Sequence, residues 1–405
     1  MELTPVPDAL REVLGRAAPL AAERVPLSAA LGRVLREPAR TDLDSPPFDA
    51  SAMDGYAVST ATWSGGASAP AGPFSLRLIG ESPAGAAYPG TVGPGECVRI
   101  FTGAPVPAGA DCVVKQEDAT RVGGNVRITN IPAHGQFIRR RGENRRAGDV
   151  VVPAGARLGP AEIGALASAG VTQPLVTRRP RVVHVVTGNE LIAPDRTPTG
   201  AQIRDSNSAL VAALVAQAGG ELAGQAHAPD NLAAANAALA ALPAHEVLLI
   251  SGGAGGGDHD FARPVLAGLG YTLHFQQVNL RPGKPLVFAS KGERLAFALP
   301  GNPVSHWVTF HLFVAPALRK FVDGLDAGPP RFRGRLAPDG PLPPPDSRQT
   351  IWPARAAVVD GEHQLTLLAL ASSGDSSGLA GANALVPLPA KGLNFDQPVE
   401  FINCG

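Results

Sequence analysis

The feature that most restricts the fold of this chain is a regular alternation of apolar runs with helix-like segments between residues 178 and 325. The runs RVVHVVTG and EVLLIS are apolar nearly throughout, which is typical of strands in a parallel sheet covered by helices on both faces. Segments such as DSNSALVAALVAQAGG begin with polar residues and end with glycines, which predicts helices. This alternation predicts a doubly wound, mostly parallel α/β domain over residues 178–325.

The remainder of the chain is expected to form smaller, β-rich parts, because 405 residues exceed what one compact core holds. Between residues 47 and 146, short runs such as FSLRLIG and DCVVKQ are separated by glycine and proline, which predicts a β-rich domain. The stretch DGLDAGPPRFRGRLAPDGPLPPPDS has the composition of a linker. The runs TIWPARAAVV, QLTLLAL and ALVPLPA that follow it predict a small β domain over residues 330–405.

Charge and cysteine content exclude several classes of function. Lysine plus arginine number 35, as do aspartate plus glutamate, so no net field favours nucleic acid or an acidic membrane surface. Cys97, Cys112 and Cys404 lie far apart, which argues against a disulfide framework or a zinc knuckle and favours a reducing compartment. The N-terminus shows no apolar signal region, and no stretch reaches the length of a membrane span. We therefore expect a soluble cytoplasmic protein that binds neither nucleic acid nor membrane.

Three loops are expected to meet at the carboxyl edge of the predicted sheet, where open α/β sheets bind their ligands. Glycines let a backbone approach a bulky ligand and aim N–H groups at an anion, and the start of the helix opened by Asn302 and Pro303 offers further donors. The loops predict a phosphate or pterin cradle; the plain alternative for the glycine loop is a flexible surface loop. The loops are TGNEL, SGGAGGGDHD and LPGNPVS, and the cradle residues are Ser251, Gly252, Gly253, Gly257, Pro300, Gly301, Asn302 and Pro303.

Carboxylates follow these loops. Glu190, Asp258 and Asp260 come after two of the strands, and Asp230 is expected nearby. Carboxylates beside a phosphate-binding loop would repel the phosphates unless a divalent cation lies between the two kinds of group. Mg²⁺ binds in this way, through one or two carboxylates plus substrate phosphates. Each acid taken alone is better explained as a solvated loop charge or a helix cap. Together at one sheet edge they favour a metal site.

The turn LRPGKP supplies the opposite charge. It places Arg281 and Lys284 on a stiff Pro-Gly turn. A planar guanidinium and a point-like ammonium at this spacing suit a compact tetrahedral oxyanion. The alternative is a hairpin turn with ordinary exposed basic residues.

Motifs along nearly the whole chain resemble those of the molybdopterin molybdenumtransferases, the family of the bacterial MoeA type and of the gephyrin E-domain. The resemblance implies a molybdenum-cofactor-biosynthesis-type α/β domain, an elongated dimerisation domain over residues 1–46 and 147–177, and a C-terminal β-barrel. The motifs, in the family's order, are PPFDASAMDGYAV, IFTGAPVPAGADCVV, RRRGENRRAGDVV, TGNEL, GAQIRDSNSALV, SGGAGGGDHDF, RPGKP and LPGNPVS.

The resemblance also implies an activity. Family members insert molybdenum from molybdate into adenylylated molybdopterin, with a divalent cation such as Mg²⁺, and release molybdenum cofactor and AMP. They are homodimers, and expected partners are the molybdopterin adenylyltransferase and apo-molybdoenzymes or their chaperones. Asp54 and Thr102 would reach the cleft from the second subunit. From the residues alone, an Asx turn before Gly55 and a strand-end hydroxyl cap are the favoured explanations of these two positions.

The family's site residues carry over by motif. Glu190, Asp230 and Asp260 match its acidic, metal-binding and catalytic positions, and Asp54 and Thr102 complete the catalytic set. Asp205 and Asn207 lie in the matching motif GAQIRDSNSALV, as expected substrate-binding residues. The residues matched to molybdate binding are Arg281, Lys284, Ser305, Arg355 and Ser373.

This chain also departs from the family pattern. Asn144 stands where an aspartate is frequent and cannot supply charge to a metal. Gly255 replaces a loop serine, and Gln277 replaces a lysine; these changes keep open a related nucleotide or pterin hydrolase as an alternative function. His306 and Trp307 stand where smaller or aliphatic residues are frequent. A non-catalytic pathway scaffold is the other alternative, and the sequence does not separate molybdate from tungstate as substrate.

Overall fold

The computed structural model divides into two compact units, Met1–Glu23 with Gly32–Arg36 and Leu175–Gly405, and Arg24–Leu31 with Glu37–Pro174. The predicted four-domain division is finer than this and stays a prediction. The structure describes residues 3–63, 73–229, 231–253, 262–325, 328–338, 341–344, 346–389, 395 and 397–405.

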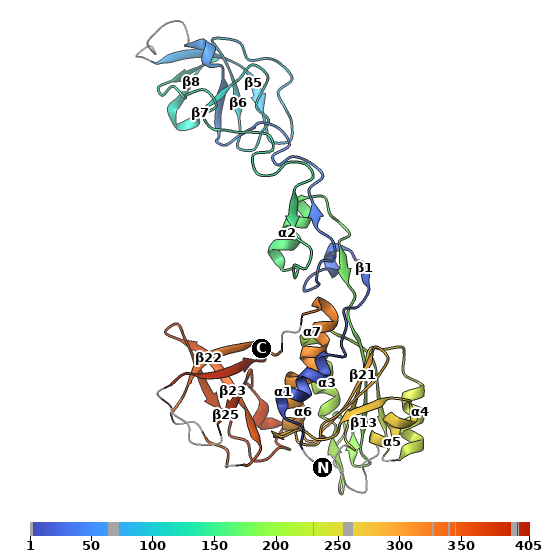
Figure 1. Cartoon of the computed structure of the whole chain (residues 1–405). Coiled ribbons are helices and arrows are strands. Elements are labelled where there is room, and N and C mark those ends of the chain that lie inside the picture. Colours follow the sequence, from blue (N-terminus) through green and yellow to red (C-terminus); the bar gives the residue numbers. More distant parts are fainter. Residues whose placement is uncertain are drawn as a thin grey trace. The chain divides into compact units, whose positions relative to one another are not determined.

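A six-stranded sheet forms the centre of the first unit (Figure 1). The first four strands of the sheet pair in parallel with one another. β20 is antiparallel to both of its neighbours, β21 and β18. The predicted doubly wound, mostly parallel sheet is therefore confirmed. In spatial order the strands are β16 (Glu221–Ala228), β13 (Arg181–Thr187), β17 (Val247–Ser251), β21 (Arg294–Leu299), β20 (Val287–Lys291) and β18 (Thr272–Phe275).

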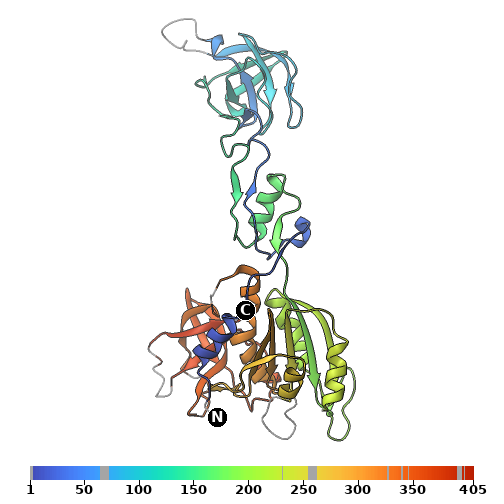
Figure 2. The same ribbon diagram turned by 45° about the vertical axis from the view of Figure 1, so that its right-hand side comes forward.

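Helices cover both faces of this sheet (Figures 1 and 2). Leu249 of β17 packs into one core, whereas its neighbours Leu248 and Ile250 pack into the other, because successive strand residues point to opposite faces. The first core includes residues of α1 (Val6–Leu14), α3 (Asn207–Gln217), α6 (Pro303–Thr309) and α7 (Ala315–Asp323), and the second includes residues of α4 (Leu232–Ala240) and α5 (Ala262–Gly268).

One predicted helix is interrupted. The segment expected as a single helix over residues 302–322 consists of α6, a π-helical turn over Phe310–Val314, and α7. Pro316 has no N–H to donate to the carbonyl four residues earlier, and the helix widens in the turn directly before it.

A closed five-stranded barrel forms the C-terminal part of the first unit. β25 pairs with β26 and also returns to β23, so the ring of strands closes and confirms the expected barrel. The barrel strands are β22 (Arg331–Leu336), β23 (Gln349–Val359), β24 (Glu362–Leu367), β25 (Ala384–Leu388) and β26 (Val399–Asn403).

Two features of this barrel differ from the expectation. β22 lies within the stretch expected as a linker, and its Gly334 and Leu336 are buried while its three arginines are exposed. The arginines made the alternation of buried and exposed positions in this strand difficult to recognise in the sequence. In addition, the short strand β19 (Leu280–Arg281) pairs in parallel with β23, although it belongs by sequence to the α/β part.

The second unit contains a six-stranded half-barrel sheet with the order β7-β4-β6-β5-β9-β8. Cys97 and Cys112 are buried in its core, where burial raises the pKa of each thiol to about 12. Its strands are β4 (Gly55–Val58), β5 (Phe74–Ser82), β6 (Glu96–Ile100), β7 (Cys112–Lys115), β8 (Ala119–Val122) and β9 (Asn125–Ile128).

Shorter elements complete the chain. α2 (Pro160–Ser168) follows β11 (Val150–Val152), which pairs with β2 (Ala39–Arg40). Three further pairs of short strands are β3 (Ala50–Ser51) with β10 (Ile138–Arg139), β1 (Ala22–Arg24) with β12 (Leu175–Thr177), and β14 (Leu191–Ile192) with β15 (Ile203–Arg204). Within the described ranges, the helices are too short or too polar to cross a membrane.

Gly55 makes the half-barrel possible, because β4 lies between β6 and β7 and a Cβ at Gly55 would lie 1.8 Å from the Val114 carbonyl oxygen. We expect Gly55→Ala to lower the free energy of unfolding of this unit by about 4 kcal/mol or more, since backbone must move to relieve the clash. Urea unfolding measures the loss. Gly124→Ala is the matched control, because nothing lies within 4 Å of its added Cβ. Equal stability of the two variants would contradict the prediction.

Glu246 joins the starts of β13 and β17. Its carboxylate accepts hydrogen bonds from Arg178 Nη2 at 2.7 Å, Arg178 Nη1 at 3.0 Å and the Arg181 N–H at 2.8 Å. Burial alone raises the pKa of Glu246, but the bonds from Arg178 and Arg181 outweigh it and hold the pKa below its ordinary value. The carboxylate therefore stabilises the fold above the unfolded-state pKa, and this contribution is lost as pH falls through the lower, folded-state pKa.

We expect Glu246→Gln to lower the free energy of unfolding by about 1–3 kcal/mol at pH 7, the range for hydrogen bonds to charged groups. The difference from the unmodified chain should shrink below pH 4. Urea unfolding of both proteins at pH 7 and at pH 3.5 measures it. A difference that stays constant with pH would rule out the charged form of Glu246 as the cause.

Candidate active site

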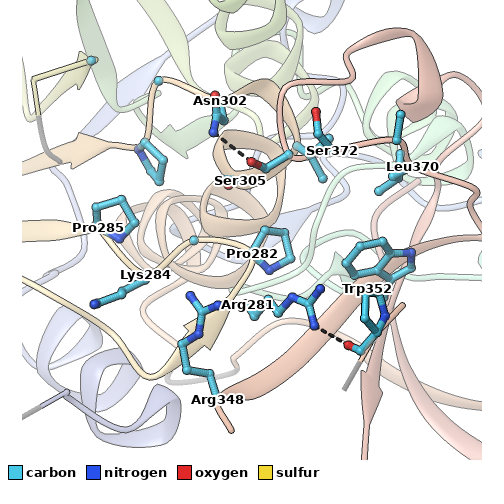
Figure 3. Close-up of a pocket in the computed structure, with 18 of the residues that line it drawn as sticks. Arg281, Pro282, Lys284, Pro285, Asn302, Ser305, Arg348, Trp352, Leu370 and Ser372 are labelled. Atoms are coloured by element: carbon cyan, nitrogen blue, oxygen red, sulfur yellow. Dashed lines mark hydrogen bonds between the residues drawn. The ribbon is translucent and has the colours of Figure 1, made fainter. Parts of the chain in front are cut away.

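A cavity of about 620 Å³ lies between the α/β part and the barrel of the first unit (Figure 3). Arg281, Lys284 and Arg348 gather on one side of it, and Asn302, Ser305 and Ser372 on the other. The cavity thus combines cations with hydroxyl and amide groups. Its remaining lining residues are Gly252, Gly253, Pro282, Gly283, Pro285, Pro300, Gly301, Val304, Pro344, Trp352, Leu370, Ala371 and Ser373.

The strands that precede the three predicted loops end at one edge of the sheet, because β13, β17 and β21 are adjacent and parallel. Gly252 has a φ of +97°, and a Cβ there would lie 2.6 Å from Thr187 Oγ1. Gly253 also has a positive φ, of +61°. Only glycine suits Gly252, since a side chain would meet both backbone strain and the neighbouring strand end.

The start of α6 is tied to the barrel. Asn302 occupies the N-cap position and Pro303 the first turn, as predicted, but the Asn302 side chain does not cap the helix. Asn302 Nδ2 donates to Ser373 Oγ at 2.8 Å, and the Val304 N–H donates to the Ser373 carbonyl at 3.1 Å. Ser305, in the first turn of α6, is almost fully buried and lines the cavity.

Four of the residues predicted to bind substrate do not line the cavity. Pro303 and Ser251 do not line it, and Ser251 is buried. Asn207 Nδ2 donates to the Gly301 carbonyl at 2.7 Å and so supports a loop that does line it. Asp205 accepts from the Ser208 N–H at 3.0 Å at the start of α3. Direct substrate binding by these four residues stays a prediction, and Gly257 lies outside the described residues.

Arg281 is held by contacts from the barrel. Its Nη1 donates to the Pro344 carbonyl, its Nε lies 3.7 Å from Asp346 Oδ2, and its guanidinium carbon lies 5.9 Å from the centre of the Trp352 ring. Gly283 in the same turn has a φ of +122°, and a Cβ there would lie 2.7 Å from Thr309 Cγ2. The predicted stiff turn is therefore packed against α6 on one side and the barrel on the other.

Arg348 is a cavity residue that the sequence interpretation missed. Its Nε and Nη2 donate to the two carboxylate oxygens of Asp346 at 2.8 and 2.6 Å, and its N–H donates to Asp346 Oδ1 at 2.9 Å. These hydrogen bonds hold the pKa of Asp346 well below its usual range. Arg355, the arginine matched to the family's barrel residue, is instead exposed on β23 and does not line the cavity. Ser373, the matched serine, does line it.

A row of polar side chains, buried except for the exposed Gln225, lies next to the glycine loop. Gln225 Nε2 lies 2.8 Å from His184 Nδ1, His184 Nε2 lies 2.7 Å from Ser251 Oγ, and Ser251 Oγ lies 3.4 Å from His306 Nδ1. Because the Gln225 amide also donates to the Ser208 carbonyl, its nitrogen faces His184, which fixes His184 as the Nε2–H tautomer. Burial lowers the pKa of His184 and of His306 to about 3, so both are neutral near pH 7.

The predicted metal ligands are only partly described. Glu190 is exposed two residues beyond Gly188, at the same sheet edge, and it is absent from the cavity lining. Asp230, Asp258 and Asp260 lie outside the described residues. Among the side chains that the structure does describe, no cluster of three or more His, Cys, Asp or Glu could hold a metal. The metal site therefore stays a prediction.

Asp54 and Thr102 contact each other in the second unit. Asp54 Oδ1 accepts from the Thr102 N–H at 2.7 Å and from Thr102 Oγ1 at 2.8 Å, and these bonds lower the pKa of Asp54. The pair connects the middle of one motif, SAMDGYAV, to the start of the other, FTGAPVP. Its proposed role across a dimer interface stays a prediction.

The described positions that depart from the family pattern are not among the residues that line the cavity. Asn144 is exposed and accepts from Arg139 Nη2 at 2.6 Å, and Gln277 does not line the cavity. His306 and Trp307 are buried, with the Trp307 ring 4.5 Å from that of His311. Gly255 lies outside the described residues.

Comparisons with known proteins cover most of the chain. Residues 4–170 match a family model described as the MoeA N-terminal region (domain I and II), and residues 184–320 match one described as a probable molybdopterin binding domain. A molybdopterin molybdenumtransferase from a Nostoc species is 38% identical over 91% of this chain and 85% of its own length. One from Staphylococcus aureus is 29% identical over 98% and 95%. The crystal structure of a molybdopterin biosynthesis MoeA protein from Pyrococcus horikoshii superimposes with a TM-score of 0.80 at 28% identity, covering 100% of both chains.

Proposed function

Because the chain belongs to the molybdopterin molybdenumtransferase family of molybdenum cofactor biosynthesis, we propose that it inserts molybdenum from molybdate into adenylylated molybdopterin and releases molybdenum cofactor and AMP. The observation that carries this proposal is the cavity, in which three cations face hydroxyl and amide groups (Figure 3). A tetrahedral dianion needs charge on one side and short hydrogen-bond donors around it, and this arrangement supplies both.

The oxyanion is bound by Lys284, Arg281, Arg348 and Ser305 in this proposal. Lys284 supplies a compact charge on a flexible stem, and the two arginines supply planar forks. The Ser305 hydroxyl donates from the first turn of α6. Gly252, Gly253 and Gly301 let the phosphate-linked part of the substrate approach the backbone, which supplies N–H donors.

The same proposal includes a divalent cation. Glu190, with Asp230 and Asp260, would hold Mg²⁺ beside the substrate phosphates, and the ion would neutralise their charge. Binding by one or two carboxylates plus phosphates is the usual mode for this ion, so Glu190 at the sheet edge is compatible with it. We also expect a homodimer in which Asp54 and Thr102 complete the site of the partner subunit.

The chemistry that these residues support is cleavage of the phosphoanhydride of adenylylated molybdopterin together with insertion of molybdenum. The cationic side of the cavity holds molybdate in one orientation, which turns an encounter between two substrates into a positioned reaction. Fixed donors then stabilise the negative charge that builds up as AMP leaves. Attack by a molybdate oxygen and attack by water are both compatible with this placement.

The test is AMP release from adenylylated molybdopterin by the purified full-length protein, with and without Mg²⁺ and with and without molybdate. We expect release to require both. Release without molybdate would instead indicate a phosphoanhydride hydrolase. The absence of release under all four conditions, with binding of pathway enzymes retained, would indicate a scaffold.

A further inference from the structure

We propose that Asp346 is a positioning residue that fixes both Arg348 and Arg281 at the cavity and thereby sets its affinity for the oxyanion. Asp346 itself does not line the cavity, so it acts through the two arginines. The inference rests on the proposed function, because it assigns the support of the same oxyanion site. None of the family motifs identified in the sequence includes Asp346.

The contact with Arg348 is a two-point ion pair. Both carboxylate oxygens are used, one by Nε at 2.8 Å and one by Nη2 at 2.6 Å, and the Arg348 N–H adds a third bond at 2.9 Å. A guanidinium has five N–H donors in a fixed plane, so two are used by Asp346 and three stay available to a ligand. The carboxylate thus fixes the plane of Arg348 while leaving most of its donors unused.

The contact with Arg281 comes from a distant part of the sequence. Arg281 Nε lies 3.7 Å from Asp346 Oδ2, the same oxygen that Arg348 Nη2 contacts. The side chains of Asp346 and Arg281 are each only 19% exposed, so water screens this pair incompletely. A residue that merely stabilised its own loop would need only the Arg348 contact. The second contact, to a different wall of the cavity, indicates a role in the site.

Charge balance supports the same role. Arg281, Lys284 and Arg348 surround one cavity and repel one another, and Asp346 lies against two of the three. The formal charges of the three cations and of Asp346 add up to +2, which matches a dianion such as molybdate. Among the described residues, no ion-pair partner contacts Lys284.

The experiment is a calorimetric titration of the full-length protein with molybdate. The variants are Asp346→Ala, Arg348→Ala and the double variant. We expect Asp346→Ala to weaken binding by about tenfold, because the guanidinium planes are no longer fixed. In the Arg348→Ala background, the same change should weaken binding by no more than about threefold, since most of its effect passes through Arg348. In the AMP-release assay, Asp346→Ala should raise the KM for molybdate while kcat stays within about threefold.

Glu400→Gln is the matched control, because Glu400 pairs with Arg331 at 2.7 Å on the same barrel and both side chains are more than half exposed. Unchanged or tighter binding by Asp346→Ala overturns the inference, as does an equal loss with and without Arg348. If Asp346→Ala does not fold, as judged by circular dichroism, Asp346→Asn gives the same test with one acceptor oxygen retained. If the unmodified protein does not bind molybdate, the proposed oxyanion site itself is wrong.

Discussion

Replacing Lys284 by alanine is expected to raise the molybdate concentration needed for half-maximal AMP release by about 10- to 100-fold, because a hydrogen bond to a charged group contributes about 1.5–3 kcal/mol. Lys284 is half-buried in the turn between Pro282 and Pro285, and its ammonium has no ion-pair partner among the described residues. Unlike the two arginines, it is not already neutralised by Asp346. Its loss therefore removes the charge that is most available to the ligand.

The measurement is the rate of AMP release as molybdate is varied at a fixed concentration of adenylylated molybdopterin. Lys291→Ala is the matched control, because Lys291 is exposed at the end of β20 and its Nζ donates to the Leu269 carbonyl at 2.8 Å. The control should follow the unmodified protein. An unchanged molybdate dependence in Lys284→Ala would remove Lys284 from the oxyanion site.

Replacing Glu190 by glutamine is expected to lower the rate of AMP release by about 10²–10³ at saturating substrates, while the fold is retained. Glu190 follows β13 at the same sheet edge as the cavity and is exposed, so its carboxylate is accessible to an ion and its loss disturbs no core packing. Glutamine keeps the size and the hydrogen-bonding capacity of the side chain but removes the charge that a divalent cation requires.

The measurement is a titration of AMP release with Mg²⁺ in Glu190→Gln and in Glu293→Gln. Glu293 is an exposed acid in the turn between β20 and β21, at the opposite end of the sheet. The Glu293 variant should lose activity only when EDTA removes the ion. Near-normal turnover of the Glu190 variant, with an unchanged Mg²⁺ requirement, would show that other groups hold the metal.

The parts of the fold that depend on local pattern could be predicted from the sequence. The apolar runs of β13 and β17 and the positions of Asn302 and Pro303 at the start of α6 are predicted correctly, because strand burial and helix starts impose recognisable patterns on neighbouring residues. These elements predict that three loops lie at one edge of the sheet. That step needed only the rule that neighbouring parallel strands end on the same side.

The barrel side of the cavity could not be predicted in this way. Arg348 and Trp352 stand just after a proline-rich stretch whose composition indicates a linker, and Arg348 is 67 positions from Arg281 in the sequence. Only closure of the barrel brings them to the cavity. The pair Asp346 and Arg348, two residues apart, was the one local signal available. The tautomer of His184 likewise depends on Gln225, a contact across two strands.

Backbone pairing between β19 and β23 restricts how the two walls of the cavity can move. Leu280 is in register with Gln349, and Arg281 with Thr350, so the turn that carries Arg281 and Lys284 is bonded directly to the barrel strand that follows Arg348. Swinging the barrel outward as a rigid body would break these main-chain bonds. The turn and the barrel strand are therefore expected to move together when substrate enters and product leaves.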